Sequence, residues 1–286
     1  MISKATFQLL RFHFSFFLMP VYWFALSQVQ DVVVLHAVLI FFILHVLIYP
    51  ASNGYNSYMD RDTGSIGGIV NPLQPTKQLY HVTVVMDVVA LLLSALISWY
   101  FFAGVVVFIA ASRAYSYRGI RLKKYPIIGY LTVTVFQGAL VYFIVQHGSS
   151  LNKHTNVSIP AMIAASLLIG AFYPLTQIYQ HRQDAEDGVI SISAKLGYRG
   201  TFMFSAIIFL LAMIMLAWYF GNNLELDRFF IIQIFMLPAL VYFFRWMYLV
   251  YKTNSAANFK HTMTMNLVGS ICSNASFISI LLIEKL

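Results

Sequence analysis

The chain is poor in cysteine and in charge, and both shortages exclude functions. A single cysteine, Cys272, excludes an internal disulfide framework and a metal site built from several cysteines. Only 10% of the 286 residues are charged, and the sequence contains no Walker loop, no Gly-x-Ser-x-Gly and no His-Glu-x-x-His. Walker-type nucleotide binding, that form of serine hydrolysis and zinc hydrolysis are therefore not indicated.

What the chain has in abundance is apolar sequence. It is 60% hydrophobic and 16% aromatic, with a mean hydropathy of +0.75, which is typical of a polytopic membrane protein. Segments of about 20 apolar residues can be placed nine times. They lie near 11–28, 33–57, 79–98, 100–116, 126–146, 159–179, 201–221, 228–250 and 262–282. The split near Trp99 has an alternative, since Leu79 to Ala114 also reads as one kinked segment.

The Lys and Arg residues set the expected orientation. A cytoplasmic N-terminus places 15 of the 18 on the cytoplasmic side, all except Lys153, Arg228 and Lys285. We expect an integral protein of the bacterial inner membrane that keeps its first apolar segment, because no signal-type cleavage site follows it. The net charge of +8 then reflects loop bias and contact with anionic membrane lipid, with no nucleic-acid partner.

Two polar segments end long apolar runs and share one spacing. In each, two amides and an aspartate recur at relative positions 0, 3 and 7, which is one face of a helix. The residues are Asn53, Asn56 and Asp60 in the first and Gln177, Gln180 and Asp184 in the second. Glycine-containing polar loops follow, at 63–71 and 188–200. We expect a single domain over 1–286 in which both motifs meet at the cytoplasmic end of a helix bundle around a central cavity.

Carboxylate and amide oxygens suit magnesium, which takes few protein ligands and keeps water or phosphate oxygens in its other positions. The alternative is that each motif is a capped helix end with ordinary loop charges. A basic, aromatic loop from Arg113 to Pro126 is expected on the same side, where Arg and Lys would bind a diphosphate. Its alternative is a membrane anchor with interfacial tyrosines.

Other polar residues have simpler interpretations. Asp87, inside the third segment, is either a proton-relay group or a packed, hydrogen-bonded residue. Arg11 and His13, at the start of the first segment, are expected to snorkel to the interface. The glycines from Gly64 to Gly68 follow a membrane helix and not a strand. They therefore indicate a flexible lid and not a dinucleotide-binding loop.

With these motifs, nearly the whole chain resembles the UbiA-type intramembrane prenyltransferase superfamily. Asn56 and Asp60 match its first motif, and Tyr115 or Tyr117 with Arg121 and Lys123 resembles its Tyr/Lys loop. The run from Asp184 through Gly188 and Ser191 to Leu196 and Gly197 is similar to the end of its second motif. The chain departs from the family at Ser57, Gly64 and Gln180, where many members have aspartate.

The resemblance implies an all-α bundle of nine spans and Mg²⁺-dependent transfer of a prenyl group from an isoprenyl diphosphate to a lipophilic or aromatic acceptor. It implies catalytic and metal-binding roles for Asn56, Asp60 and Asp184, and supporting metal ligands in Asp62, Gln180 and Asp187. Diphosphate would be bound by Arg118, Arg121, Lys123, Tyr115 and Tyr117, with the prenyl tail leaving sideways toward lipid. The number of metal ions, the acceptor and the prenyl length stay open. Two other functions also stay open: an intramembrane terpene cyclase of the same fold, and a non-enzymatic transporter or lipid-binding protein.

Overall fold

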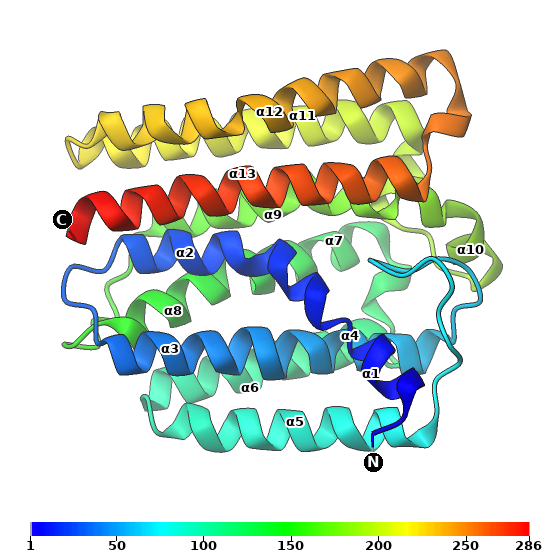
Figure 1. Cartoon of the computed structure of the whole chain (residues 1–286), viewed down its shortest axis with the longest axis horizontal. Helices are drawn as coiled ribbons and strands as arrows, with labels where there is room; N and C mark the ends of the chain where they lie inside the picture. Colours follow the sequence, from blue (N-terminus) through cyan, green and yellow to red (C-terminus); the bar gives the residue numbers. More distant parts are fainter. Residues whose placement is uncertain (1, 286) are drawn as a thin grey trace.

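The protein is an all-helical bundle whose long helices run nearly parallel (Figure 1). The computed structural model describes residues 2–285, with side chains described through residue 283. Within these residues, nine helices are long and apolar enough to cross a membrane, and the only extended pairings are two isolated bridges. The predictions of an all-α fold and of nine spans are confirmed. Backbone groups have no water partner in a bilayer, so each span must satisfy them within its own helix.

The nine spans are composed of the following helices. Span one consists of α1 (Lys4–Leu10), η1 (Phe12–Leu18) and α2 (Met19–Ser27), span two of α3 (Val34–Phe42), η2 (Ile43–Ile48) and α4 (Tyr49–Asp60), and span three of α5 (Lys77–Ala95). Span four is α6 (Trp99–Ser116), span five consists of α7 (Pro126–Thr134), η4 (Val135–Leu140) and α8 (Val141–Ser149), and span six of α9 (Ile159–Gln177), η5 (Ile178–Gln180) and α10 (His181–Glu186). The last three are α11 (Ile192–Asn222), α12 (Leu226–Lys252) and α13 (Phe259–Lys285), and two short turns, η3 (Leu122–Lys124) and η6 (Asn254–Ala256), lie in loops.

The division near Trp99 is confirmed as a true break between two spans. α5 ends at Ala95 and α6 begins at Trp99. Ser98 caps the new helix, because its hydroxyl accepts a hydrogen bond from the Phe101 backbone N–H at 3.0 Å.

Two predicted helix boundaries are wrong. The first span begins at Lys4 and breaks at Arg11, whose left-handed φ of 49° ends α1. The seventh begins at Ile192, inside the stretch 188–200 that was expected to be a loop. Ser191 caps it, and the chain kinks at Gly197, where φ is 68°. Beyond the kink, the Thr201 hydroxyl donates to the Gly197 carbonyl at 2.7 Å.

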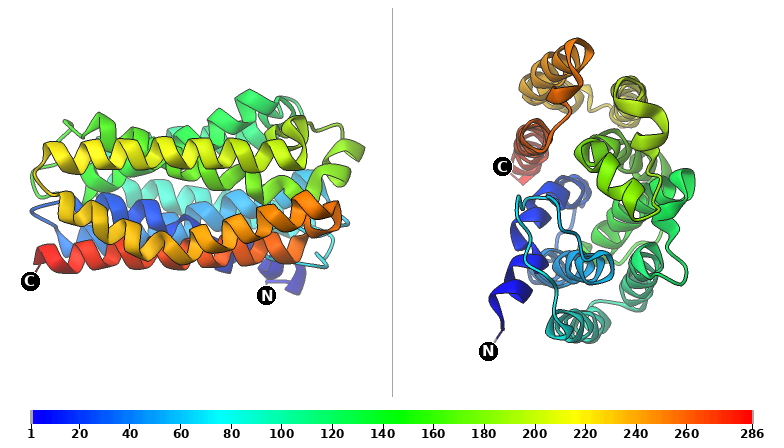
Figure 2. Two further views of the ribbon diagram at one scale, coloured as in Figure 1. Left: turned by 90° about the horizontal axis from the view of Figure 1, so that it is seen from above. Right: turned by 90° about the vertical axis from the view of Figure 1, so that its right-hand side faces the viewer.

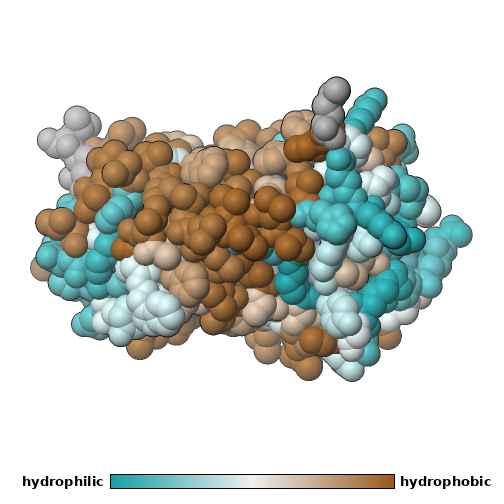
Figure 3. All heavy atoms as spheres, turned by 90° about the horizontal axis from the view of Figure 1, so that it is seen from below, coloured by the Kyte–Doolittle hydropathy of each residue, from teal (hydrophilic) through white to brown (hydrophobic). Residues whose placement is uncertain are grey.

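The two polar motifs lie at the same end of the bundle. The right-hand view of Figure 2 looks at the bundle from that end, with α10 and the segment after α4 nearest the viewer. A space-filling view shows a broad hydrophobic band between hydrophilic ends (Figure 3). This distribution fits a bilayer crossing, in which the polar ends would meet water.

An ion pair joins the third and fourth spans. Arg113 of α6 forms a salt bridge with Asp87 of α5, and its Nε donates to Asp87 Oδ2 at 3.0 Å. The guanidinium also lies 3.9 Å from the centre of the Tyr55 ring on α4. The Arg113 side chain therefore faces Asp87 and Tyr55 and not the rest of the basic loop. Of the two interpretations of Asp87, a proton-relay group or a packed, hydrogen-bonded residue, the ion pair favours the second.

Replacing Asp87 by alanine should destabilise the protein by about 3 kcal/mol, because the Arg113 side chain, only 20% exposed, would lose its charged partner and keep only its contacts with Thr83. Thermal unfolding in detergent measures this as a lower Tm. The matched control is Asp227→Ala at the exposed start of α12. Equal Tm values for the two variants would contradict the structural role of the pair.

Candidate active site

A cavity of about 280 Å³ lies where the two polar motifs end. Its lining includes every residue of the two predicted stripes, Asn53, Asn56, Asp60, Gln177, Gln180 and Asp184. The expectation that both stripes face one cavity is confirmed. In the first motif the helix α4 runs unbroken to Asp60. In the second the chain passes through the 3₁₀ turn η5, following Pro174, which cannot donate the backbone hydrogen bond of a regular helix.

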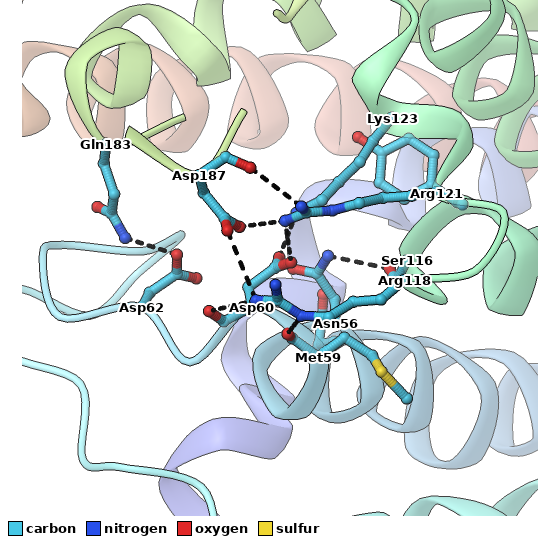
Figure 4. Close-up of polar contacts among 12 residues, drawn as sticks. Asn56, Met59, Asp60, Asp62, Ser116, Arg118, Arg121, Lys123, Gln183 and Asp187 are labelled. Carbon is cyan, nitrogen blue, oxygen red and sulfur yellow. Dashed lines mark hydrogen bonds and ion pairs between the residues drawn. The ribbon is translucent and has the colours of Figure 1, made fainter. Parts of the chain in front are cut away.

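The Asp60 carboxylate is enclosed, with a side chain that is only 4% exposed. It forms a salt bridge with Lys123, and Arg121 Nη2 lies 3.5 Å from its Oδ1 (Figure 4). One turn earlier on α4, Asn56 Nδ2 donates to Ser116 Oγ at 3.0 Å. Asn56, Asp60 and Lys123 all line the cavity, so a charged group entering it meets both a carboxylate and an ammonium.

A second set of ion pairs lies beside the cavity. Arg121 forms a salt bridge with the Asp187 carboxylate and donates to the Asp187 carbonyl at 3.0 Å (Figure 4). Arg118 donates to the Met59 carbonyl at 2.7 Å, which satisfies one of the last carbonyls of α4. Neither arginine is among the cavity-lining residues, and nor is Asp187. These contacts tie the end of α4, the η3 loop and the end of α10 together.

Asp62 lines the cavity just beyond the end of α4. Gln183 Nε2 donates to its Oδ1 at 2.5 Å. Burial, followed by the nearby charge of Asp60, raises the pKa of the Asp62 carboxyl. A cation bound beside Asp62 would lower this pKa again, because it favours the charged form.

Two positions that differ from the family pattern have different surroundings. A side chain at Gly64 would place its Cβ 2.6 Å from Gln183 Oε1, so the flexible end of Gln183 would have to move aside. Ser57 is 4% exposed and is not among the cavity-lining residues. The departure at Ser57 therefore removes no group from the cavity wall.

Arg11 was missed as a site residue, and the expectation that it snorkels is wrong. It is 7% exposed and lines the cavity, and its Nη2 donates to the Asn53 carbonyl at 3.2 Å. The helix break at Arg11 turns the side chain inward, and its Nε has no hydrogen-bond partner among the described residues. The only signal in the sequence was a basic residue inside an apolar run.

Two tyrosines of the basic loop differ in position. Tyr115 lines the cavity, and its hydroxyl lies 2.5 Å from that of Tyr173 on α9. Tyr117 is 49% exposed and is not among the cavity-lining residues.

From α13, Asn266 adds a buried amide whose Nδ2 is unpartnered within the described chain. No spacing rule in the sequence joined α13 to the motifs.

Aromatic side chains make up part of the cavity wall. Phe14, Phe17, Phe108, Phe136 and Phe172 line it, and Phe14 lies at the charged end, where the Arg11 guanidinium is 5.5 Å from its ring centre. Among the described residues, no three His, Cys, Asp or Glu side chains converge into a metal cage. A cation bound here would complete its coordination with oxygens of its ligand, as magnesium does with phosphates.

Nine apolar helices within the described residues define an integral membrane protein, and a partly charged cavity lies at one end of its bundle. The chain belongs to the UbiA prenyltransferase family, whose model matches residues 17–268. Among curated proteins, no sequence matches it.

Solved structures share the fold at low sequence identity. A UbiA homologue from Archaeoglobus fulgidus bound to DMAPP and Mg²⁺ has a TM-score of 0.71 and 16% identity, over 98% of this chain and 100% of that one. The apo UbiA homologue from Aeropyrum pernix K1 has a TM-score of 0.68 and 17% identity, over 94% and 98%. A digeranylgeranylglyceryl phosphate synthase structure has a TM-score of 0.63 and 17% identity, over 99% of both chains.

Proposed function

We propose that this protein transfers a prenyl group from an isoprenyl diphosphate to an aromatic acceptor within the membrane, in a magnesium-dependent reaction. Family membership supports the prenyl transfer. The single observation that carries the proposal is one cavity lined by Asp60, Asp62 and Asp184, with Lys123 beside Asp60 and an aromatic interior.

The donor set fits a magnesium ion. Asp60, Asp184 and Asn56 would hold it, with Asp62 and Gln180 as supporting oxygen ligands, since all five line the cavity. Bound there, magnesium supplies positive charge that stabilises a leaving diphosphate. Asp187 stays a predicted ligand, although its carboxylate is paired with Arg121. In support, the Archaeoglobus fulgidus homologue of the same fold was solved with DMAPP and Mg²⁺.

The basic residues would bind the diphosphate by exchanging partners. Lys123 and Arg121 are now paired with Asp60 and Asp187. When the carboxylate charge of Asp60 is taken up by a cation, Lys123 is released to phosphate oxygens. The other predicted diphosphate contacts are Arg121, Tyr115, Arg118 and Tyr117. Of these four residues, Tyr115 lines the cavity.

The rest of the cavity would protect the carbocation formed when diphosphate leaves. Its phenylalanine rings would offer π faces to a cation, and a bound prenyl chain would displace water from the cavity. The acceptor ring would then form the new carbon–carbon bond and lose a proton. We place this site at the cytoplasmic face of a bacterial inner membrane, with the N-terminus cytoplasmic, because Arg118, Arg121, Lys123 and Lys124 gather at this end.

Product analysis tests the reaction. Purified protein in nanodiscs receives Mg²⁺, geranyl diphosphate and a panel of aromatic acceptors, and the expected products are prenylated acceptors, absent with Asp184→Asn. Terpene products formed equally well without any acceptor would support a cyclase instead. No turnover by folded protein would support a non-enzymatic function.

A further inference from the structure

A chain of uncharged polar side chains joins the second motif to the basic loop. The Tyr173 hydroxyl of α9 lies 2.5 Å from the Tyr115 hydroxyl of α6, and it also interacts with the side-chain amide of Gln177, one turn further along α9. Gln177 Oε1 in turn accepts from the Ser193 backbone N–H at 3.4 Å. Gln177, Tyr173 and Tyr115 all line the cavity. The metal and diphosphate contacts proposed above do not include Gln177 or Tyr173.

The Gln177 amide sets the direction of the hydrogen bonds in this chain. A glutamine side chain has an acceptor at Oε1 and two donor hydrogens at Nε2. Because Oε1 faces the Ser193 N–H, Nε2 is the atom left for the Tyr173 hydroxyl. Nε2 can only donate, so the Tyr173 oxygen accepts this bond.

The Tyr173 hydrogen is then directed to Tyr115. Among the described residues, the partners of the Tyr173 hydroxyl are Gln177 and Tyr115, and of these two the Tyr115 oxygen is the acceptor. A hydroxyl has one hydrogen, so the Tyr115 hydrogen is not used in this contact and can enter the cavity. Asp60 and Asp184 lie near enough for their charges to act on the Tyr115 hydroxyl. The hydrogen is therefore available where a metal-bound diphosphate would lie.

A carboxylate at position 177 would reverse the chain. An ionised glutamate has no hydrogen to donate, so Tyr173 would donate to it and would accept from Tyr115. The Tyr115 hydrogen would then be held by Tyr173 and lost to a phosphate oxygen. Glutamine and glutamate have nearly the same size, yet they give the Tyr115 hydroxyl opposite directions.

We propose that Tyr173 and Gln177 are positioning residues, which turn the hydrogen of Tyr115 toward the leaving diphosphate. The inference rests on the proposed prenyl transfer and on a contact between Tyr115 and the diphosphate. A hydrogen bond to a charged oxygen is stronger than one between neutral groups, and this bond strengthens as negative charge grows on the leaving group. Tyr173 and Gln177 act through Tyr115 and do not donate to the substrate themselves.

A double-mutant cycle tests whether Tyr173 acts through Tyr115. The measured quantity is kcat/KM for Mg²⁺-dependent diphosphate release from geranyl diphosphate in nanodiscs. Tyr115→Phe should lower it about tenfold, because the hydrogen bond to the charged leaving group is lost. Tyr173→Phe should lower it about threefold, because Tyr115 keeps its hydrogen but loses its orientation. In the Tyr115→Phe background, Tyr173→Phe should have no further effect.

The results of this cycle separate the inference from the proposed function. Equal effects of Tyr173→Phe in the two backgrounds would overturn the positioning role and leave the proposed function standing. No release by the folded, unmodified protein would instead count against the proposed function. The control is Tyr130→Phe on α7. Tyr130 packs on Tyr173 with ring centres 6.4 Å apart but is not among the cavity-lining residues, so this change should leave kcat/KM unaltered.

Gln177→Glu tests the direction of the hydrogen bonds. It should lower kcat/KM about tenfold, as Tyr115→Phe does. Adding Tyr173→Phe should restore kcat/KM to within about threefold of the unmodified protein, because Tyr115 then has no hydroxyl to donate to and recovers its hydrogen. A loss caused by the added negative charge would persist in the double variant and would overturn the proposal. If Gln177→Glu does not fold, the cycle of Tyr115 and Tyr173 decides alone.

Discussion

Replacing Asp60 or Asp184 by asparagine should reduce Mg²⁺-dependent diphosphate release by about a hundredfold or more, because each change removes a cavity carboxylate while keeping the side-chain size. Asp60 has the larger expected effect. Its side chain is 4% exposed and paired with Lys123, so its charge is little screened by water. Phosphate release from geranyl diphosphate in nanodiscs, coupled to a pyrophosphatase, measures the change.

The matched control for Asp184 lies on the same helix. Glu186 of α10 is 65% exposed and contacts Arg182 four residues away. Glu186→Gln removes an equal charge from the same end of the protein, outside the cavity, and should retain nearly full activity. If Asp184→Asn and Glu186→Gln were equally active and equally folded, Asp184 would have no role in the reaction.

Replacing Lys123 by methionine should raise the KM for the prenyl diphosphate about tenfold or more, because the ammonium that would meet a phosphate is lost. The side chain is 11% exposed and lines the cavity. Methionine retains much of its length and apolar contact. Substrate dependence of diphosphate release in the presence of saturating Mg²⁺ gives KM and kcat separately.

Lys124 provides the adjacent control. Its Nζ lies 4.9 Å from the Tyr125 ring centre, the residue is exposed, and it is not among the cavity-lining residues. Lys124→Met changes net charge by the same amount and should leave KM unchanged. Equal increases in both variants would mean that the overall positive field of this end, and not a contact by Lys123, attracts the substrate.

The parts that could be predicted from sequence are those fixed by the bilayer and by helix periodicity. A span must be helical and about 20 residues long, so apolar length located all nine. The 3.6-residue period brought Asn56 and Asp60 to one face because α4 is regular up to Asp60. The second motif kept its face although η5 is a 3₁₀ turn, since Gln177, Gln180 and Asp184 all reach the cavity.

The parts that could not be predicted depend on local backbone conformation and on packing between distant segments. Arg11 enters the cavity because a non-glycine residue adopts a left-handed conformation, which L side chains rarely do. Asn266 and Gln183 take their places through the packing of α13 and α10. The separation of Tyr115 from Tyr117 depends on where α6 ends, at Ser116.

The most direct measurement is diphosphate release from geranyl diphosphate by the unmodified protein in nanodiscs, with Mg²⁺ and with a chelator. The proposed site predicts release with Mg²⁺ and almost none with the chelator, restored by adding Mg²⁺ back. Equal release in both conditions, or no release by folded protein with aromatic acceptors present, would contradict a metal-dependent prenyltransferase.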